Sequence, residues 1–245
     1  MSFTGQHVVV MGGTSGIGEA AATRFAADGA EVVVTGRDRA RLDAAVERIG
    51  GKVEGHVLDG TDPEQIAAFF AGHGAIDHLV LALSGSSGAG PLAGLDLGAE
   101  GDLAAGFAGK FWPFVRILQA ALPTLRRDGS VTFVTAASAR AAFPGTSGLA
   151  AINGALEAMV PPLAVELAPL RVNAVSPGVV DTPWWHAMPD DARATFFDGM
   201  AAATPVGRVG RPDEIAAAIA MLAGNGFVTG VVFDCTGGAN LATGR

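Results

Sequence analysis

The stretch Val8-Val9-Val10-Met11-Gly12-Gly13-Thr14-Ser15-Gly16-Ile17-Gly18 decides the fold of this 245-residue chain. A short β-branched run, typical of a buried strand, leads into a glycine-rich turn and then an alanine-rich helical pattern that ends near Gly29. Backbone amides at the N-terminus of such a helix attract negative charge, and this is where a dinucleotide pyrophosphate binds. Gly12 permits the tight turn, Gly16 lets the backbone approach a phosphate, and Gly18 allows close packing of helix on strand.

The predicted phosphate contacts therefore come from one turn: Gly12, Thr14, Ser15, Gly16, Ile17 and Gly18. Thr14 and Ser15 add hydroxyl donors to the backbone amides. A glycine-rich loop by itself is equally typical of a simple turn. Its place between a strand and a helix is what favours nucleotide binding here.

Strand-like runs alternate with helical stretches along the rest of the chain. Further strands are expected at residues 31–35, 52–58, 77–83, 130–135, 171–176 and 231–234. Helices are expected at residues 16–28, 38–49, from 62, through 110, 149–167 and 212–223. Trp112-Pro113 should bend the helix that contains Lys110, and Pro161-Pro162 should interrupt the helix at 149–167. The chain shows no linker, charge block or repeat. The pattern predicts one α/β domain over residues 1–245, a doubly wound Rossmann-type parallel sheet with helices on both faces.

Composition limits the function classes. The formal net charge of −8 argues against nucleic-acid binding, which needs a basic face. No apolar run approaches the ~20 residues that span a bilayer, and the N-terminus lacks the basic start of a signal peptide, so we expect a cytoplasmic protein without membrane contact. The five histidines are scattered and Cys235 is the single cysteine, which predicts neither a metal site nor an internal disulfide.

The end of the second predicted strand, Thr35-Gly36-Arg37, bears on the choice of cofactor. An acidic residue here would bind the adenosine ribose of NAD, but this chain has Gly36 followed by Arg37. A guanidinium pairs well with a 2′-phosphate, so NADP(H) is favoured, the alternative being a solvated loop cation. Asp59, with Gly60 after the third strand, reaches the adenine amine or is only a turn residue, and both alternatives stay open.

On these motifs the chain resembles the short-chain dehydrogenase/reductase family over essentially its whole length. Besides the turn, residues 171–178 match the family's segment ending in Pro-Gly, and residues 204–208 and 233–238 match its C-terminal half. The resemblance implies that cofactor contacts near the nicotinamide come from Pro177, Gly178, Val180 and Thr182.

The chain departs from the family pattern at the catalytic positions. Where the family has Asn-Asn-Ala-Gly, this chain has residues 81–85, Leu-Ala-Leu-Ser-Gly. The family's helix asparagine falls on Lys110, its catalytic serine on Ala136, and its Tyr-x-x-x-Lys pair on Leu149 and Asn153; the chain contains no tyrosine at all. The remaining cofactor contacts implied by the resemblance are Leu83, Ser84, Gly85, Ala136 and Asn153.

In the family the tyrosine supplies the proton for carbonyl reduction, a role worth about 10²–10⁴-fold in rate. Three residues are candidates for the altered catalytic centre. Lys110 would have a lowered pKa in an apolar cleft and act as the acid, unless it is a surface lysine reaching solvent. Ser138 is a hydroxyl donor to substrate or a loop serine bonded to backbone. Asn153 takes the place of the family lysine beside the nicotinamide ribose, or is an ordinary helix residue.

Trp184, Trp185 and His186 lie where the family has its substrate-covering loop. Adjacent tryptophans favour a large apolar or aromatic substrate, although the pair would equally seal a subunit interface. His186 is a substrate-binding candidate or a solvated loop histidine.

Two classes of function remain. The first is an NADP(H)-dependent oxidoreductase with a non-standard active site, acting on an apolar or aromatic small molecule with an imine, an activated C=C bond or a carbonyl. The second is a catalytically inactive nucleotide-binding or scaffold protein. The resemblance and the apolar, charge-poor composition together predict a homodimer or homotetramer, formed through the helices that contain Lys110 and residues 149–167.

Overall fold

Seven parallel strands form one sheet in the computed structural model, which describes residues 1–85 and 87–241. The strand order is β3-β2-β1-β4-β5-β6-β7, and every neighbouring pair is parallel. The strands are β1 (His7–Met11), β2 (Glu31–Gly36), β3 (Val53–Val57), β4 (Ile76–Leu81), β5 (Leu125–Val134), β6 (Arg171–Pro177) and β7 (Val232–Cys235). The predicted doubly wound sheet is confirmed.

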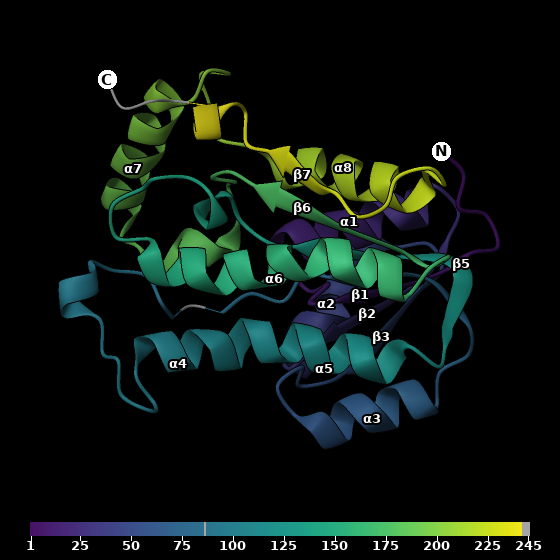
Figure 1. Cartoon of the computed structure of the whole chain (residues 1–245). Helices are drawn as coiled ribbons and strands as arrows, with labels where there is room; N and C mark the ends of the chain where they lie inside the picture. The colour runs from purple at the N-terminus through teal and green to yellow at the C-terminus, as the bar shows by residue number, and fades with distance from the viewer. Residues whose placement is uncertain (86, 242–245) are drawn as a thin grey trace.

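Helices cover both faces of the sheet, with α5 and α6 on one side and α1 and α8 on the other (Figure 1). The helices are α1 (Gly16–Ala27), α2 (Arg39–Ile49), α3 (Pro63–Ala71), α4 (Asp102–Gly106), α5 (Trp112–Ala121), α6 (Ser147–Glu166), α7 (Asp190–Ala203) and α8 (Pro212–Gly224). Alternate residues of a strand point to opposite faces. In β1, Val8 and Val10 join the core under α1 and α8, while Val9 and Met11 join the core under α5 and α6.

The helix that carries Lys110 is not bent in the predicted way. A π-helical turn, Phe107–Phe111, joins α4 to α5, and Figure 1 shows the two as one long rod. Pro113 has no N–H and its ring crowds the preceding turn, which the wider π-helical turn accommodates. The amide of Trp112 donates to the carbonyl of Phe107, five residues earlier. Lys110 therefore lies on a local widening of the helix, not beside a kink.

Two other helices differ from the sequence prediction. Pro161 and Pro162 do not interrupt α6, which runs through them; both are exposed, so solvent can reach the carbonyls that they leave without a donor. Helix α7 was not predicted. By length and composition alone α6 could cross a membrane. In the fold, its residues Leu156 and Val160 are buried in the core against the sheet.

His78 on β4 is a buried histidine held in its neutral form. Its Nδ1 lies 2.8 Å from Ser130 Oγ and its Nε2 lies 3.0 Å from Gln6 Oε1. Burial and, to a smaller extent, the charge of Arg171 lower the pKa of His78 from 6.5 to about 4, against a smaller opposing effect of nearby carboxylates. Protonation in the folded state is therefore costly.

We expect acid to destabilise the fold through His78. Between pH 6.5 and 4 the unfolded chain binds this proton and the folded chain does not, so stability falls as pH falls through that window, by about 3 kcal/mol from this group. Urea unfolding of the wild type and of His78→Gln at pH 7 and pH 4.5 measures the effect. The variant should lose less stability than the wild type between the two values. Equal losses would contradict the assignment.

Candidate active site

A cavity of about 770 Å³ opens at the carboxyl ends of the strands. In open parallel sheets ligands bind at this edge, where the strand order reverses. The predicted residues that line it are Gly12, Thr14, Ser15, Gly16, Ile17, Gly18, Arg37, Leu83, Ser84, Gly85, Lys110, Ala136, Ser138, Asn153, Pro177, Gly178, Val180, Thr182, Trp184 and Trp185. Asp59, Gly60 and His186 are not among its lining residues. Segments far apart in sequence thus form one site.

The phosphate-binding end is built by the turn between β1 and α1. Gly12 has φ +83°, in the region that favours glycine. A Cβ added at Gly18 would lie 2.1 Å from the carbonyl oxygen of Gly12, so only glycine lets α1 begin this close to the strand. Ser15 is the N-cap residue of α1 but its side chain makes no cap hydrogen bond. Its hydroxyl is therefore available to a ligand.

The adenosine end carries two guanidinium groups. Arg37 and Arg41 both line the cavity, and within the described part of the chain neither side chain has a hydrogen bond or ion pair. A Cβ added at Gly36 would lie 2.3 Å from Thr14 Cγ2, so a side chain at the position where an acidic residue would bind a ribose requires Thr14 to move. Arg41 was missed from sequence, although it lies one helical turn after Arg37.

Asp59 supports a loop. Its Oδ1 accepts hydrogen bonds from the Thr61 amide at 2.9 Å and the Thr61 hydroxyl at 2.8 Å. This favours the turn-residue alternative for Asp59 over an adenine contact, and Gly60 packs beside Leu83. His186 instead lines a second hollow, shared with Arg41 and Arg48.

The three catalytic candidates form one hydrogen-bonded chain. Lys110 Nζ donates to Asn153 Oδ1 at 2.8 Å, and Asn153 Nδ2 donates to Ser138 Oγ at 3.3 Å and to the Leu149 carbonyl at 2.9 Å. Lys110 Nζ also lies 3.5 Å from the Thr135 carbonyl oxygen. The chain joins the π-helical turn, α6 and the short helix η3 (Ala137–Ala139) at the cavity wall. The alternative of Lys110 as a solvent-directed surface lysine does not hold.

Burial lowers the pKa of Lys110 to about 8, while the carboxylate of Glu157 opposes the shift. Glu157 is itself buried and accepts hydrogen bonds from Thr135 Oγ1 at 2.8 Å and Arg140 Nε at 3.0 Å. Arg140 also forms an ion pair with Asp234. A pKa of about 8 lies in the range that suits a general acid at neutral pH.

By the resemblance, the contact between Lys110 and Asn153 joins two positions of the family's catalytic pattern. The resemblance assigns asparagine to position 110 and lysine to position 153, and this chain has the reverse. The structure puts the two side chains in direct contact. An ammonium and an amide therefore persist in the site, each supplied by the opposite helix. Leu149, at the tyrosine position, lines the cavity with an apolar side chain.

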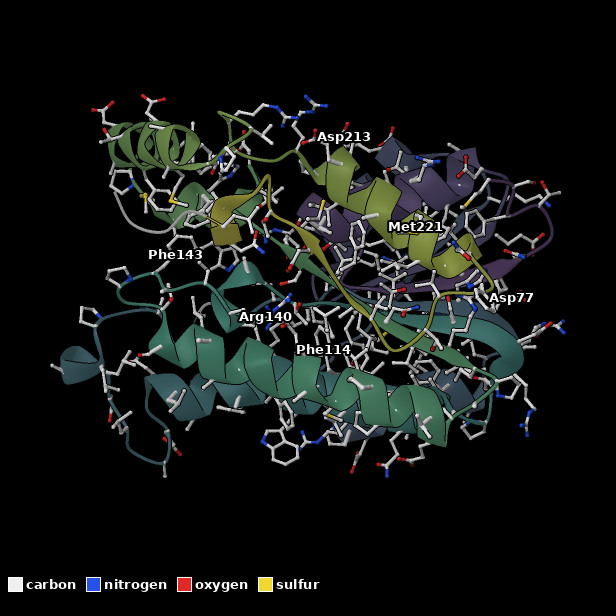
Figure 2. All side chains as sticks on the ribbon, turned by 45° about the horizontal axis from the view of Figure 1, so that its top comes forward. Asp77, Phe114, Arg140, Phe143, Asp213 and Met221 are labelled. Atoms are coloured by element: carbon white, nitrogen blue, oxygen red, sulfur yellow. The ribbon has the colours of Figure 1, made fainter. Side chains whose placement is uncertain are left out.

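Aromatic and apolar side chains close the other end of the cavity. Trp184 and Trp185 pack edge to face with ring centroids 4.5 Å apart, and their indole N–H groups donate to the carbonyls of Gly85 and Val180. Phe196 and Met200 of α7, with Phe143 and Pro144, complete this apolar wall. Figure 2 shows Phe143 at the end of the molecule where α6 and α7 face each other, with Arg140 nearer the centre. The spacing of Phe196 and Met200, four residues apart, was the missed sequence signal.

A glycine turn at a helix start, a cation pair and an apolar pocket at the switch point of a parallel sheet define a dinucleotide-binding α/β protein. The family model described as Enoyl-(Acyl carrier protein) reductase matches residues 12–240. The chain belongs to the short-chain dehydrogenase/reductase family and is an oxidoreductase.

Known relatives align over nearly the whole chain. The 3-oxoacyl-(acyl-carrier-protein) reductase FabG of Thermotoga maritima is 32% identical, with 97% of this chain and 99% of the relative covered. L-fucose dehydrogenase of Mus musculus is 33% identical, with 99% and 91% covered. A solved small-chain dehydrogenase in complex with NADPH is 33% identical with a TM-score of 0.83, covering 96% of this chain and 99% of the other.

We expect Lys110 to titrate near pH 8 in the native protein. The chain has only two lysines, so Lys52, which is exposed and paired with Glu31, is an internal reference. Acetic anhydride labelling at a series of pH values, followed by mass spectrometry, should show Lys110 labelling rise to half its maximum at about pH 8. Glu157→Gln should move the midpoint to lower pH because the carboxylate holds the pKa up. A midpoint that does not move would exclude Glu157 as the cause.

Proposed function

We propose that this protein is an NADP(H)-dependent oxidoreductase that reduces or oxidises an apolar or aromatic small molecule through an atypical catalytic centre without the family's Ser-Tyr-Lys set. The observation that carries the proposal is the hydrogen-bonded chain of Lys110, Asn153 and Ser138 inside a dinucleotide-type cavity with an aromatic wall. An imine, an activated C=C bond and a carbonyl are the reducible groups compatible with the loss of tyrosine.

The cavity fits a nicotinamide dinucleotide phosphate. The turn Gly12 to Gly18 would hold the pyrophosphate at the N-terminus of α1, and Arg37, with Arg41, would hold the 2′-phosphate. Pro177, Gly178, Val180 and Thr182 would border the nicotinamide, as the family resemblance implies. The NADPH complex of a structural relative supports the same cofactor. When bound, such a cofactor supplies a hydride.

The chain's own residues supply the proton. Lys110 holds it at Nζ, and Asn153 orients that ammonium through the 2.8 Å hydrogen bond. Ser138 presents a hydroxyl at the same wall, fixed by the Asn153 amide. The tryptophans and Phe196 exclude water and bind the apolar part of the substrate.

NADPH should bind more tightly than NADH. Gly36 lies at the position where NAD-binding chains have an acidic residue, and the adjacent Arg37 is available to pair with the 2′-phosphate. Arg37→Ala should weaken NADPH binding by roughly 1.5–3 kcal/mol, the range for a hydrogen bond to a charged group, and leave NADH binding nearly unchanged. Calorimetric titration of both cofactors measures this. Arg39→Ala is the matched control, since Arg39 is exposed and paired with Asp43. Equal affinities for both cofactors would overturn the assignment.

Turnover should depend on Lys110 and Ser138. NADPH oxidation is first screened over ketones, enones and imines to find a substrate. Lys110→Met should then lower kcat by about 10²–10⁴-fold with NADPH binding intact, the effect of losing a general acid. Ser138→Ala should lower it less, and Lys52→Met should leave it unchanged. If no substrate oxidises bound NADPH, the inactive nucleotide-binding alternative replaces the proposal.

The proposal includes a homodimer or homotetramer that uses the helices carrying Lys110 and residues 147–166. Apolar side chains are exposed on this surface, among them Trp112 at 48% and Val165 at 80%. Exposed apolar side chains on these helices favour burial between subunits. The cytoplasmic location stays a prediction.

A further inference from the structure

A second hollow, of about 510 Å³, adjoins the main cavity beside the glycine-rich turn. The residues that border both spaces are Thr14, Ser15, Arg41 and Pro183. The residues that border only the hollow are Ala40, Ala44, Arg48 and His186. Because Ser15 and Arg41 belong to both spaces, a group attached to a ligand at the adenosine end of the main cavity can extend past them into the hollow.

The hollow offers hydrogen-bond donors to an anion. Arg48 is already paired with Glu19, through two hydrogen bonds of 2.8 and 2.9 Å. Within the described residues, the side chains of Arg41 and His186 make no hydrogen bond or ion pair, and no aspartate or glutamate borders the hollow. The Ser15 hydroxyl makes no cap hydrogen bond either. A guanidinium, an imidazole and a hydroxyl group are therefore available together, and phosphate oxygens accept hydrogen bonds from all three.

These donors come from separate elements of the fold. Arg41 belongs to α2, whereas His186 belongs to the short helix η4 (Pro183–Ala187), more than 140 positions later in the chain. No hydrogen bond between described residues joins α2 to η4 across the hollow. A phosphate group held there would accept hydrogen bonds from both elements and would connect them.

The same short helix also forms part of the substrate end of the main cavity. Trp184 and Trp185 line that cavity, and Trp185 packs against Phe196 of α7 with ring centroids 4.8 Å apart. The chain enters η4 directly beside the phosphate-binding turn, because a Cβ added at Gly16 would lie 3.2 Å from Thr182 Cβ. A contact that fixes η4 in the hollow would therefore also fix the two tryptophans at the substrate end.

We infer that Ser15, Arg41 and His186 bind a phosphate group in this hollow, and that the 2′-phosphate of NADP(H) is its source. His186 then determines cofactor specificity from η4, while Arg37, which borders only the main cavity, approaches the same phosphate from the other side. The inference rests on the proposed function and deepens it. NADP(H) holds the tryptophans of η4 in place over the substrate end, whereas NAD(H), with an uncharged hydroxyl group at this position, does not.

The contact can be measured without turnover. Adenosine 2′,5′-bisphosphate and adenosine 5′-monophosphate differ only in the 2′-phosphate and contain no nicotinamide, and both are titrated into the protein by calorimetry. His186→Ala should weaken binding of the bisphosphate by about tenfold, the loss expected for one hydrogen bond to a charged group, and leave binding of the monophosphate unchanged. Arg41→Ala should have the same effect.

His7→Ala is the matched control for the histidine, because His7 begins β1 at the amino edge of the sheet and the cavity lies at the carboxyl edge. This variant should keep both affinities. If His186→Ala binds the bisphosphate as tightly as the wild type does, the inference is wrong.

Tryptophan fluorescence tests whether η4 responds to the phosphate. The chain has three tryptophans, and Trp112→Phe removes the one outside η4. In this background, saturating bisphosphate should change the emission of Trp184 and Trp185, and saturating monophosphate should not. Adding His186→Ala should remove the response to the bisphosphate. A response that survives His186→Ala would contradict the connection between the hollow and η4.

Inorganic phosphate distinguishes a free anion from the cofactor as the source of the phosphate. It is titrated into the same Trp112→Phe protein without nucleotide. No change in emission at concentrations that saturate the bisphosphate site supports the cofactor as the source. A full change with inorganic phosphate alone, together with a bisphosphate affinity that does not depend on His186, assigns the hollow to a free anion and overturns the inference.

Binding of the complete cofactors separates this inference from the proposed function. The ratio of NADPH to NADH affinity is measured for the wild type, Arg37→Ala and His186→Ala. A ratio that falls in both variants supports the inference. A ratio that falls in Arg37→Ala and stays at the wild-type value in His186→Ala overturns it and leaves the proposed function intact. Equal affinities of the wild type for the two cofactors overturn both.

Discussion

The position of β1 between β2 and β4 is the constraint on which the rest of the structure depends. Chain order reverses between β1 and β4, so the segments that follow these two strands run in opposite directions and leave a crevice at the carboxyl ends of the strands. The crevice stays open because α1 begins directly at the turn. Gly18 lies so close to the carbonyl of Gly12 that a methyl group would block the approach. The same closeness turns the amides of α1 toward a ligand.

Lys110 lies in this crevice, and its surroundings determine its proton affinity. A lysine buried in an apolar cleft is costly, and its charge persists only where nearby groups bond to it. Two residues of α6 stabilise the charge of Lys110. Asn153 accepts a hydrogen bond from the ammonium, and the carboxylate of Glu157 attracts it. The hydrogen bond between Lys110 and Asn153 thus holds an ammonium and an amide together in the cleft. In the proposed function Lys110 carries the proton, and Leu149 is part of the apolar wall.

Sequence patterns predicted the elements that depend on local chemistry. Asp38 caps α2 and Asp62 caps α3, each through its own carboxylate, and both starts were visible as local signals. Sequence signals predicted helices less well where packing against the rest of the fold determines their structure. The prolines of α6 suggested a break because their effect on the helix was judged without knowing that they face solvent. Helix α7 was missed because its apolar residues serve the cavity wall and not a regular core stripe.

The sequence by itself determined the strand-turn-helix unit, the missing carboxylate at Gly36 and the missing tyrosine, because each is a matter of residue identity at a known spacing. Only the tertiary structure decided that Lys110 meets Asn153 across 43 positions of chain, that Asp59 holds a loop, and that His186 lies outside the main cavity. The physical reason is that contact, burial and proton affinity depend on side chains brought together by the packing of separate elements, and no spacing along one element records them.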